Sequence, residues 1–184
     1  MSKKFLGAEI STKKLTTMAL LISLNVILVR FIGFDVNPSL RIDFGYLSNV
    51  MAGMLLGPVL GGMTAAISDL LGVILKGQIG TYFPAFTLNA ILYGVLYGAF
   101  LYKKEKTWLR ISICVSVTLL IVGIVLFPVW SYMFVMLILK KPAFYFTILA
   151  SSIIKNLIFL PIQIVTIKLI SDHLLPNIKG LGDE

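Results

Sequence analysis

The chain has 184 residues, of which 58% are hydrophobic and 13% are charged, and its formal net charge is +8. A soluble domain is about half apolar and about a quarter charged, so this composition excludes a solvated globule. A bilayer core about 30 Å thick requires about 20 mostly apolar residues for each crossing helix, and most of the sequence falls into such stretches. We therefore expect an all-α integral membrane protein, with residues 1–184 forming a single membrane domain in the lipid bilayer.

The N-terminal segment is too polar over residues 2–14 for a cleavable signal, and the apolar run after it reaches spanning length without a small-residue cleavage site. We expect it to remain as an anchor. The single cysteine, Cys114, lies in an apolar run and is expected to be a small core residue. With one cysteine and one histidine, His173, neither a metal site nor a cofactor is expected.

Charges, glycines and prolines divide the hydrophobic sequence into six candidate spans, at residues 15–33, 44–57, 59–75, 82–102, 109–138 and 143–171. This pattern predicts a six-transmembrane-helix bundle with both termini on one side. Gly57 and Pro58, followed by two further glycines, predict a helix break and a tight turn into the third span. The last two spans exceed a bilayer width, and Pro128 and Pro161 are possible kink positions.

Lysine and arginine are distributed unequally between the two sides of this map. The side of the termini carries Lys3, Lys4, Lys13, Lys14, Lys103, Lys104, Lys106, Arg110, Lys168 and Lys179. The opposite side carries Arg30, Arg41, Lys76, Lys140, Lys141 and Lys155. Because basic residues favour the cytoplasmic side, both termini are predicted to be cytoplasmic. The basic residues lie beside hydrophobic spans and lack interleaved polar surface, so no nucleic-acid partner is expected.

Polar side chains from several spans fall in the outer half of the predicted bundle. They are Arg30, Arg41, Asp43, Asp69, Lys76, Asn89, Lys155 and Asn156. A charge at membrane depth costs a few kcal/mol or more and faces a partner, a cavity or water. Their convergence predicts an outward-facing ligand cavity, and the basic excess of that side favours an anionic ligand.

Aromatic side chains gather near the same end, and the candidates for ligand contact are Tyr46, Tyr82, Phe83, Tyr93 and Trp130. Such rings could hold a flat heteroaromatic ligand while a polar group binds its edge. Aromatic residues also collect at membrane interfaces whatever the protein does, so that alternative stays open for each of them.

Structural alternatives stay open for the polar candidates as well. Arg30, Arg41 and Lys140 could reach lipid headgroups. Asp69 could pair with a cation, and Asn89 could form a helix–helix hydrogen bond.

The segment between the first two predicted spans contains glycine, asparagine and proline, which oppose helix formation. We expect a gating loop that covers a bound ligand, formed by Phe34, Asp35, Asn37 and Pro38. Residues 76–81 are a second candidate gate, and either segment could be an inert connection. On the first span, Ala19 and Ser23 place small side chains one turn apart, which allows another helix to approach closely.

Motifs for energy conversion and catalysis are missing from the sequence. It contains no phosphate-binding Gly-rich loop, no Gly-x-Ser-x-Gly motif and no paired intramembrane carboxylates. We therefore expect a non-enzyme, and an enzyme acting on lipid is disfavoured. A small membrane protein with a ligand cavity and no means of ATP hydrolysis points to a partner that supplies energy.

Five segments carry a resemblance to a known family. They are Thr16–Arg30 (TTMALLISLNVILVR), Leu40–Leu47 (LRIDFGYL), Ala52–Val59 (AGMLLGPV), Asp69–Gly72 (DLLG) and Tyr82–Asn89 (YFPAFTLN). With these residues the chain resembles the S components of energy-coupling factor (ECF) vitamin transporters, most closely the folate-specific branch.

The resemblance implies a six-helix bundle in a bacterial plasma membrane that captures folate from the extracellular side beneath the loop between helices 1 and 2. It also implies docking on a transmembrane coupling protein, the T component, which carries two cytoplasmic ATPases. In that family an Ala-x-x-x-Ala patch on helix 1 contacts the coupling protein, and the matching residues here are Ala19 and Ser23.

Folate also suits the side chains. Its pterin requires aromatic faces and an edge partner, for which Asn89, Asp69 and Asp43 are candidates. Its glutamate requires cations, for which the candidates are Arg30, Arg41, Lys76 and Lys155. Two alternatives stay open: an S component for a different vitamin, and a small self-sufficient carrier or channel.

Overall fold

The structure is a computed structural model that describes residues 3–5, 8–37, 40–42, 44–77, 80, 82–140, 142 and 144–174. Most of these ranges are helical. The helices are α1 (Thr12–Ile27), α2 (Gly45–Leu75), α3 (Pro84–Leu101), α4 (Trp108–Thr118), α5 (Phe127–Leu137) and α6 (Tyr145–Leu169). Stretches of π-helix extend three of them: η1 (Leu28–Ile32) follows α1, η3 (Leu119–Leu126) joins α4 to α5, and η4 (Ile170–Leu174) follows α6.

Two short antiparallel hairpins accompany the helices of this fold. Strands β1 (Lys3–Phe5) and β2 (Ala8–Ile10) pair before α1. Strands β3 (Phe34–Asn37) and β4 (Leu40–Ile42) pair between η1 and α2, where the sequence predicted an irregular loop. A hairpin satisfies backbone N–H and C=O groups in a segment whose glycine and proline prevent helix.

Helix α2 is a hairpin of two legs, 45–56 and 58–75, because the chain reverses at Gly57. This glycine has φ 86° and ψ 179°, which a residue with a side chain adopts only under strain, and Pro58 follows it. A Cβ placed on Gly61 would lie 3.0 Å from the Cα of Gly53, so the two legs are in contact. The reversal falls at the break that the sequence predicted.

Four helices of the described part are long and apolar enough to cross a membrane: Gly45–Leu75, Pro84–Leu101, Trp108–Leu137 and Tyr145–His173. The predicted class, a helical multi-pass membrane protein, is confirmed at this level. The helix that begins the bundle is not among the four, since α1 has 16 residues and starts with two lysines. The α2 helix counts once although its reversal divides it.

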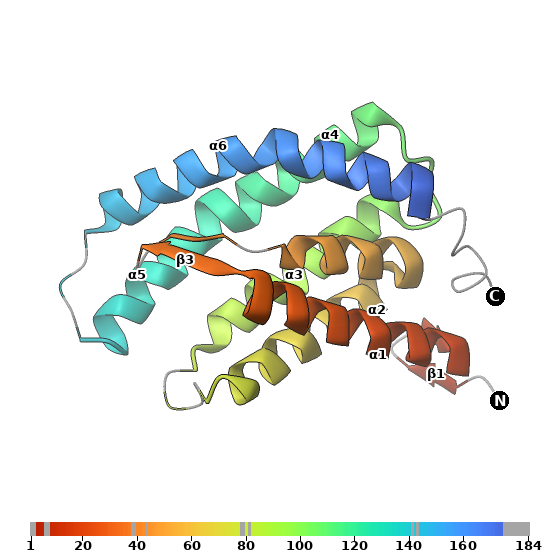
Figure 1. Ribbon diagram of the computed structural model, residues 1–184, viewed down its shortest axis with the longest axis horizontal. Helices are drawn as coiled ribbons and strands as arrows, with labels where there is room; N and C mark the ends of the chain where they lie inside the picture. The colour runs from red at the N-terminus through yellow and green to blue at the C-terminus, as the bar shows by residue number, and fades with distance from the viewer. Residues whose placement is uncertain are drawn as a thin grey trace.

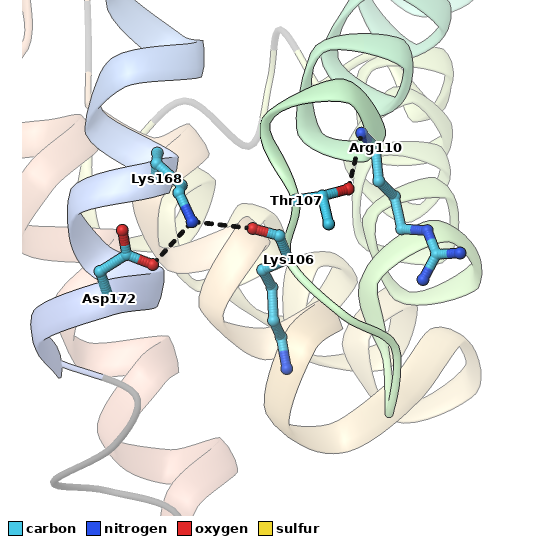
Figure 2. Close-up of polar contacts among 5 residues, drawn as sticks. All are labelled: Lys106, Thr107, Arg110, Lys168 and Asp172. Carbon is cyan, nitrogen blue, oxygen red and sulfur yellow. Dashed lines mark hydrogen bonds and ion pairs between the residues drawn. The ribbon is translucent and has the colours of Figure 1, made fainter.

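The start of α1, the α3–α4 connection and the end of α6 lie at one end of the molecule, which we call the terminal end (Figure 1). A side-chain hydrogen bond joins α6 to the α3–α4 connection at this end (Figure 2). The Nζ of Lys168 donates to the carbonyl of Lys106 over 3.0 Å and pairs with Asp172 over 2.9 Å. The hydroxyl of Thr107 caps α4 by accepting from the amide of Arg110 over 3.4 Å.

Several large side chains toward the terminal end are completely buried. Helices α3, α4 and α6 bury Tyr97, Leu101, Ile111, Val115 and Ile167 completely, each with 0% of its surface exposed. Leu101 ends α3, Ile111 starts α4 and Ile167 lies near the end of α6, so these side chains close that half of the bundle.

Candidate functional site

A cavity of about 220 Å³ lies among α1, α2, α3, the η3–α5 helix and α6. Its polar lining consists of Asn25, Tyr46, Asn49, Ser68, Asp69, Tyr93, Ser152, Lys155, Asn156 and Gln163. It occupies the half of the bundle away from the terminal end, since Asn25 lies near the end of α1 and Ser152 and Lys155 lie in the first half of α6. Four helical elements, α1, α2, α3 and α6, therefore contribute polar groups to one hollow inside an apolar bundle.

Five of the predicted binding residues line this cavity: Tyr46, Asp69, Tyr93, Lys155 and Asn156. Asp69 and Lys155 bring opposite charges from α2 and α6 to the same cavity. A cavity with one carboxylate, one ammonium and several amides and hydroxyls can bind a ligand that carries both hydrogen-bond donors and anionic or acceptor groups.

Two aromatic rings flank the ammonium of Lys155. Its Nζ lies 5.9 Å from the ring centroid of Phe127 and 6.0 Å from that of Phe159, and both rings also line the cavity. Cation–π attraction of this kind contributes about 0.5–2 kcal/mol and holds a long, flexible side chain in place. The ammonium of Lys155, which the sequence analysis placed in the last predicted span, is therefore directed into the cavity.

A hydrogen bond from α3 holds Asp69. The hydroxyl of Thr87 donates to Oδ2 of Asp69 over 2.7 Å, and the hydroxyl of Tyr82 lies 2.8 Å from that of Thr87. Tyr82 was predicted to contact the ligand itself. The structure places it one hydrogen bond behind the cavity wall, because it precedes α3 and points to Thr87.

Asn156 is seated against the backbone of the π-helix opposite. A Cβ placed on Gly123 would lie 2.6 Å from Nδ2 of Asn156, so the amide occupies the space that a larger residue would fill. The π-helical stretch η3 ends immediately before α5, whose second residue is Pro128. Proline lacks an N–H and disturbs the helix before it, and π-helical turns are frequent at functional sites.

Five polar cavity residues were missed by the sequence analysis: Ser68, Ser152 and the three amides Asn25, Asn49 and Gln163. The Nδ2 of Asn25 donates to Oδ1 of Asn49 and to the carbonyl of Gly45, each over 3.1 Å. Oε1 of Gln163 accepts from Tyr97 over 3.3 Å. Their signal was available, since an amide inside an apolar span is expensive and faces a polar partner or a cavity.

Four predicted ligand contacts do not line the cavity although their side chains are described: Lys76, Phe83, Asn89 and Trp130. Lys76 is exposed after α2. Phe83 packs against Phe86 at 5.7 Å and Phe134 at 6.1 Å between ring centroids.

Asn89 and Trp130 differ from the other two because they leave buried polar atoms without a hydrogen bond. Asn89 is 5% exposed, and neither its Nδ2 nor its Oδ1 has a partner among the described residues. The buried Nε1 of Trp130 likewise has no hydrogen-bond partner among the described residues. Buried polar atoms are nearly always paired, so these two positions call for an explanation such as a bound ligand.

The remaining candidates fall outside what the structure describes. Asp43 and Pro38 lie outside the described residues. The described part includes the backbone, but not the side chains, of Arg30, Arg41, Phe34, Asp35 and Asn37. In the β3–β4 hairpin Asp35 and Arg41 are register partners.

The predicted partner surface on α1 is exposed. Ala19 and Ser23 lie on a face with Leu15 and Leu20, which expose 58% and 62% of their surfaces. The hydroxyl of Ser23 donates to the carbonyl of Ala19 over 3.0 Å, so its polarity is satisfied within the helix. The surface that remains is small and apolar, which suits contact with another helix in a membrane.

This fold and cavity define a membrane-embedded protein built to bind a small molecule. The comparison with known proteins narrows that class: a family described as "ECF transporter, substrate-specific component" matches residues 13–171. The chain belongs to this family. The family prediction is therefore confirmed, and so is the prediction that the chain is not an enzyme, since the family is the substrate-specific part of a transporter.

Curated relatives carry the name Folate transporter FolT. The protein of Clostridium novyi (strain NT) is 36% identical over 113 residues, which are 61% of this chain and 64% of the relative, just under two thirds of its length. The protein of Leuconostoc mesenteroides is 30% identical over 158 residues, 85% of this chain and 83% of the relative. A solved structure, "Crystal structure of FolT bound with folic acid", has 34% identity, a TM-score of 0.75 and coverage of 86% of this chain and 92% of that one.

Proposed function

We propose that the chain is a folate-binding S component, which captures folate outside the cell and passes it on through an ATPase-driven coupling module. The observation that carries this proposal is the polar cavity in which Asp69, Lys155 and aromatic rings face one hollow. The likeness to relatives named FolT and to a FolT structure with folic acid supports folate as the ligand.

The cavity favours the ring part of folate over the whole molecule. Its volume of about 220 Å³ is below the roughly 300–1,000 Å³ of typical ligand pockets. The pterin would pack among rings such as Tyr93 and Phe127, with Asp69 or Asn89 at its edge. The glutamate would extend toward the β3–β4 hairpin, which lies against α6, and Lys155 would neutralise a carboxylate. Arg30, Arg41 and Asp43 remain further candidates for this role.

We propose six crossings, with the legs of α2 as separate passes and with α1 and η1 as the first. The cavity then opens to the outside, and the terminal end lies in the cytoplasm of a bacterial cell. Support comes from the basic side chains of the described terminal end: Lys13, Lys103, Lys104, Arg110 and Lys168. Basic residues of short loops favour the cytoplasmic side. The relatives named above are bacterial proteins.

The partners proposed are a T component and two ATPases. The described residues form helices and two short hairpins, and no nucleotide-binding domain lies among them. The small residues Ala19 and Ser23 are exposed on α1 and offer a contact surface for a helix of the T component. The β3–β4 hairpin, with Phe34, Asp35 and Asn37, would act as the gate over the cavity.

Binding to the purified chain tests the proposal. Titration calorimetry in detergent should give saturable folate binding at a stoichiometry near one, and mass analysis of the purified protein should find co-purified folate. Saturable binding of riboflavin, thiamine or biotin, with none of folate, would identify an S component for a different vitamin. Folate accumulation in vesicles that contain only this chain would contradict the requirement for a coupling module and favour a self-sufficient carrier.

A further inference from the structure

A chain of three side chains runs from the segment before α3 into the cavity. It starts at Tyr82, passes through Thr87 on α3 and ends at Asp69 on the second leg of α2, with steps of 2.8 Å and 2.7 Å between oxygen atoms. Thr87 is 8% exposed, so its hydroxyl is shielded from competing water. Asp69 lines the cavity, while Tyr82 and Thr87 lie behind it.

The direction of both hydrogen bonds follows from counting protons. A threonine hydroxyl has one proton, and Thr87 donates it to Oδ2 of Asp69. Its oxygen can then only accept from Tyr82, so the phenol O–H is the donor of the outer bond. The chain is thus directed from Tyr82 to Asp69. The carboxylate of Asp69 accepts the hydrogen bond from Thr87. Because a carboxylate has about four lone-pair sites, it can still accept further hydrogen bonds from a ligand in the cavity.

We infer that Tyr82 and Thr87 are positioning residues that fix the plane of the Asp69 carboxylate, and that this carboxylate selects ligands by two adjacent N–H donors on a heteroaromatic ring. The inference rests on the proposed binding of folate to this cavity. It assigns a role to two residues that do not touch the ligand, and it names the chemical feature on which selection depends.

The selected feature is the 2-amino-4-oxo edge of a pyrimidine-type ring. Its exocyclic amino group and the neighbouring ring N–H point the same way and match two carboxylate oxygens, as in the bidentate pairs that guanidinium groups form. A ring without the 2-amino group satisfies the fixed carboxylate incompletely and leaves it partly unpaired inside the bundle. Such a loss weakens binding by about tenfold to a hundredfold.

The rigidity of the carboxylate matters for this selection. Without the bond from Thr87, the side chain of Asp69 can rotate and the two oxygens no longer present one plane to the ring. Folate then binds more weakly, while a ring that lacks the 2-amino group loses little. The ratio of the two dissociation constants is therefore the readout, because a variant that only loosens the fold weakens both ligands alike.

The test compares folate with 2-deaminofolate on the purified full chain. Wild-type protein should prefer folate by about tenfold or more, and the preference should fall toward one in Thr87→Val. Thr87→Ser keeps the hydroxyl and should retain the preference. Thr64→Val is the matched control: Thr64 is 1% exposed on the same helix as Asp69, and its hydroxyl bonds only within that helix, to the carbonyl of Leu60.

Tyr82→Phe provides a second variant at the outer link, where Tyr82 is only half-buried and the fold is less at risk. It should lower the preference for folate, by less than Thr87→Val does. A preference that stays at the wild-type value in Tyr82→Phe and Thr87→Val, with helical circular dichroism intact, overturns the inference and leaves the proposed function standing. Absence of folate binding to the wild-type chain overturns the proposed function itself and the inference with it.

Discussion

Replacing Lys155 with methionine removes one charge from the cavity while keeping an unbranched apolar side chain. The ammonium lies 5.9 Å and 6.0 Å from the ring centroids of Phe127 and Phe159. Loss of those two contacts lowers the stability of the ligand-free chain by about 0.5–2 kcal/mol, and it cancels from the dissociation constant where the contacts persist in the complex. The loss that remains is one charge-assisted hydrogen bond to the ligand, about 1.5–3 kcal/mol, or roughly a 10- to 150-fold weaker affinity for folate.

Titration calorimetry with two ligands measures this effect and locates it. If Lys155 neutralises the glutamate, the loss should fall on folate and not on pteroate, which lacks the glutamate. Lys140→Met is the control, because Lys140 is exposed at the same end of the bundle and does not line the cavity. An unchanged dissociation constant in a folded Lys155→Met protein would remove this residue from the site. An equal loss with both ligands would place the ammonium at the ring instead.

Three further variants probe the cavity wall and the α1 surface. Gly123→Ala puts a Cβ about 2.6 Å from Nδ2 of Asn156 and should displace that amide, weakening folate binding several-fold with unchanged circular dichroism; equal affinity would mean that Asn156 does not contact the ligand. Asn89→Leu removes two unpaired buried atoms and should raise the ligand-free melting temperature, by the equivalent of about 1–3 kcal/mol, while weakening folate binding; a higher melting temperature with full affinity would leave Asn89 outside the site. Ser23→Phe should lower ATP-driven folate uptake about tenfold or more without changing folate binding, and normal uptake would speak against the α1 surface as the docking site.

The sequence predicted the depth of the site better than its lining. Hydropathy places a residue along the membrane normal, which is why Asp69, Lys155 and Asn156 fall at the level of the cavity. It does not determine which way a side chain points around the helix, because the spans are apolar on nearly all faces and lack a clear polar stripe. Phe83 was a predicted ligand contact, and in the structure its ring packs against Phe86 and Phe134.

Two backbone features, the chain reversal at Gly57 and the π-helical stretch η3, differ in how well the local sequence predicts them. Two adjacent residues cause the reversal at Gly57: this glycine tolerates a φ of 86°, and Pro58 cannot continue the first helix. The reversal was therefore predictable from the sequence. The π-helical stretch η3 was not predicted, although Pro128 follows it and removes a backbone N–H. The contact between Gly123 of η3 and Asn156 of α6 joins two separate spans, so it forms only in the folded bundle and was not predictable from local sequence.

The packing of the terminal end bears on how a ligand could cross the membrane. Tyr97, Leu101, Ile111, Val115 and Ile167 are each 0% exposed and close the bundle beneath the cavity. Removing one large side chain from a packed core costs about 2–5 kcal/mol. Displacing several such side chains to open a path for the ligand therefore costs on the order of 10 kcal/mol. That is comparable to the whole stability of a folded protein, about 5–15 kcal/mol. If the chain transports folate as proposed, a passage through the intact bundle is therefore disfavoured, whereas a movement of the whole chain in the membrane would leave these contacts unbroken.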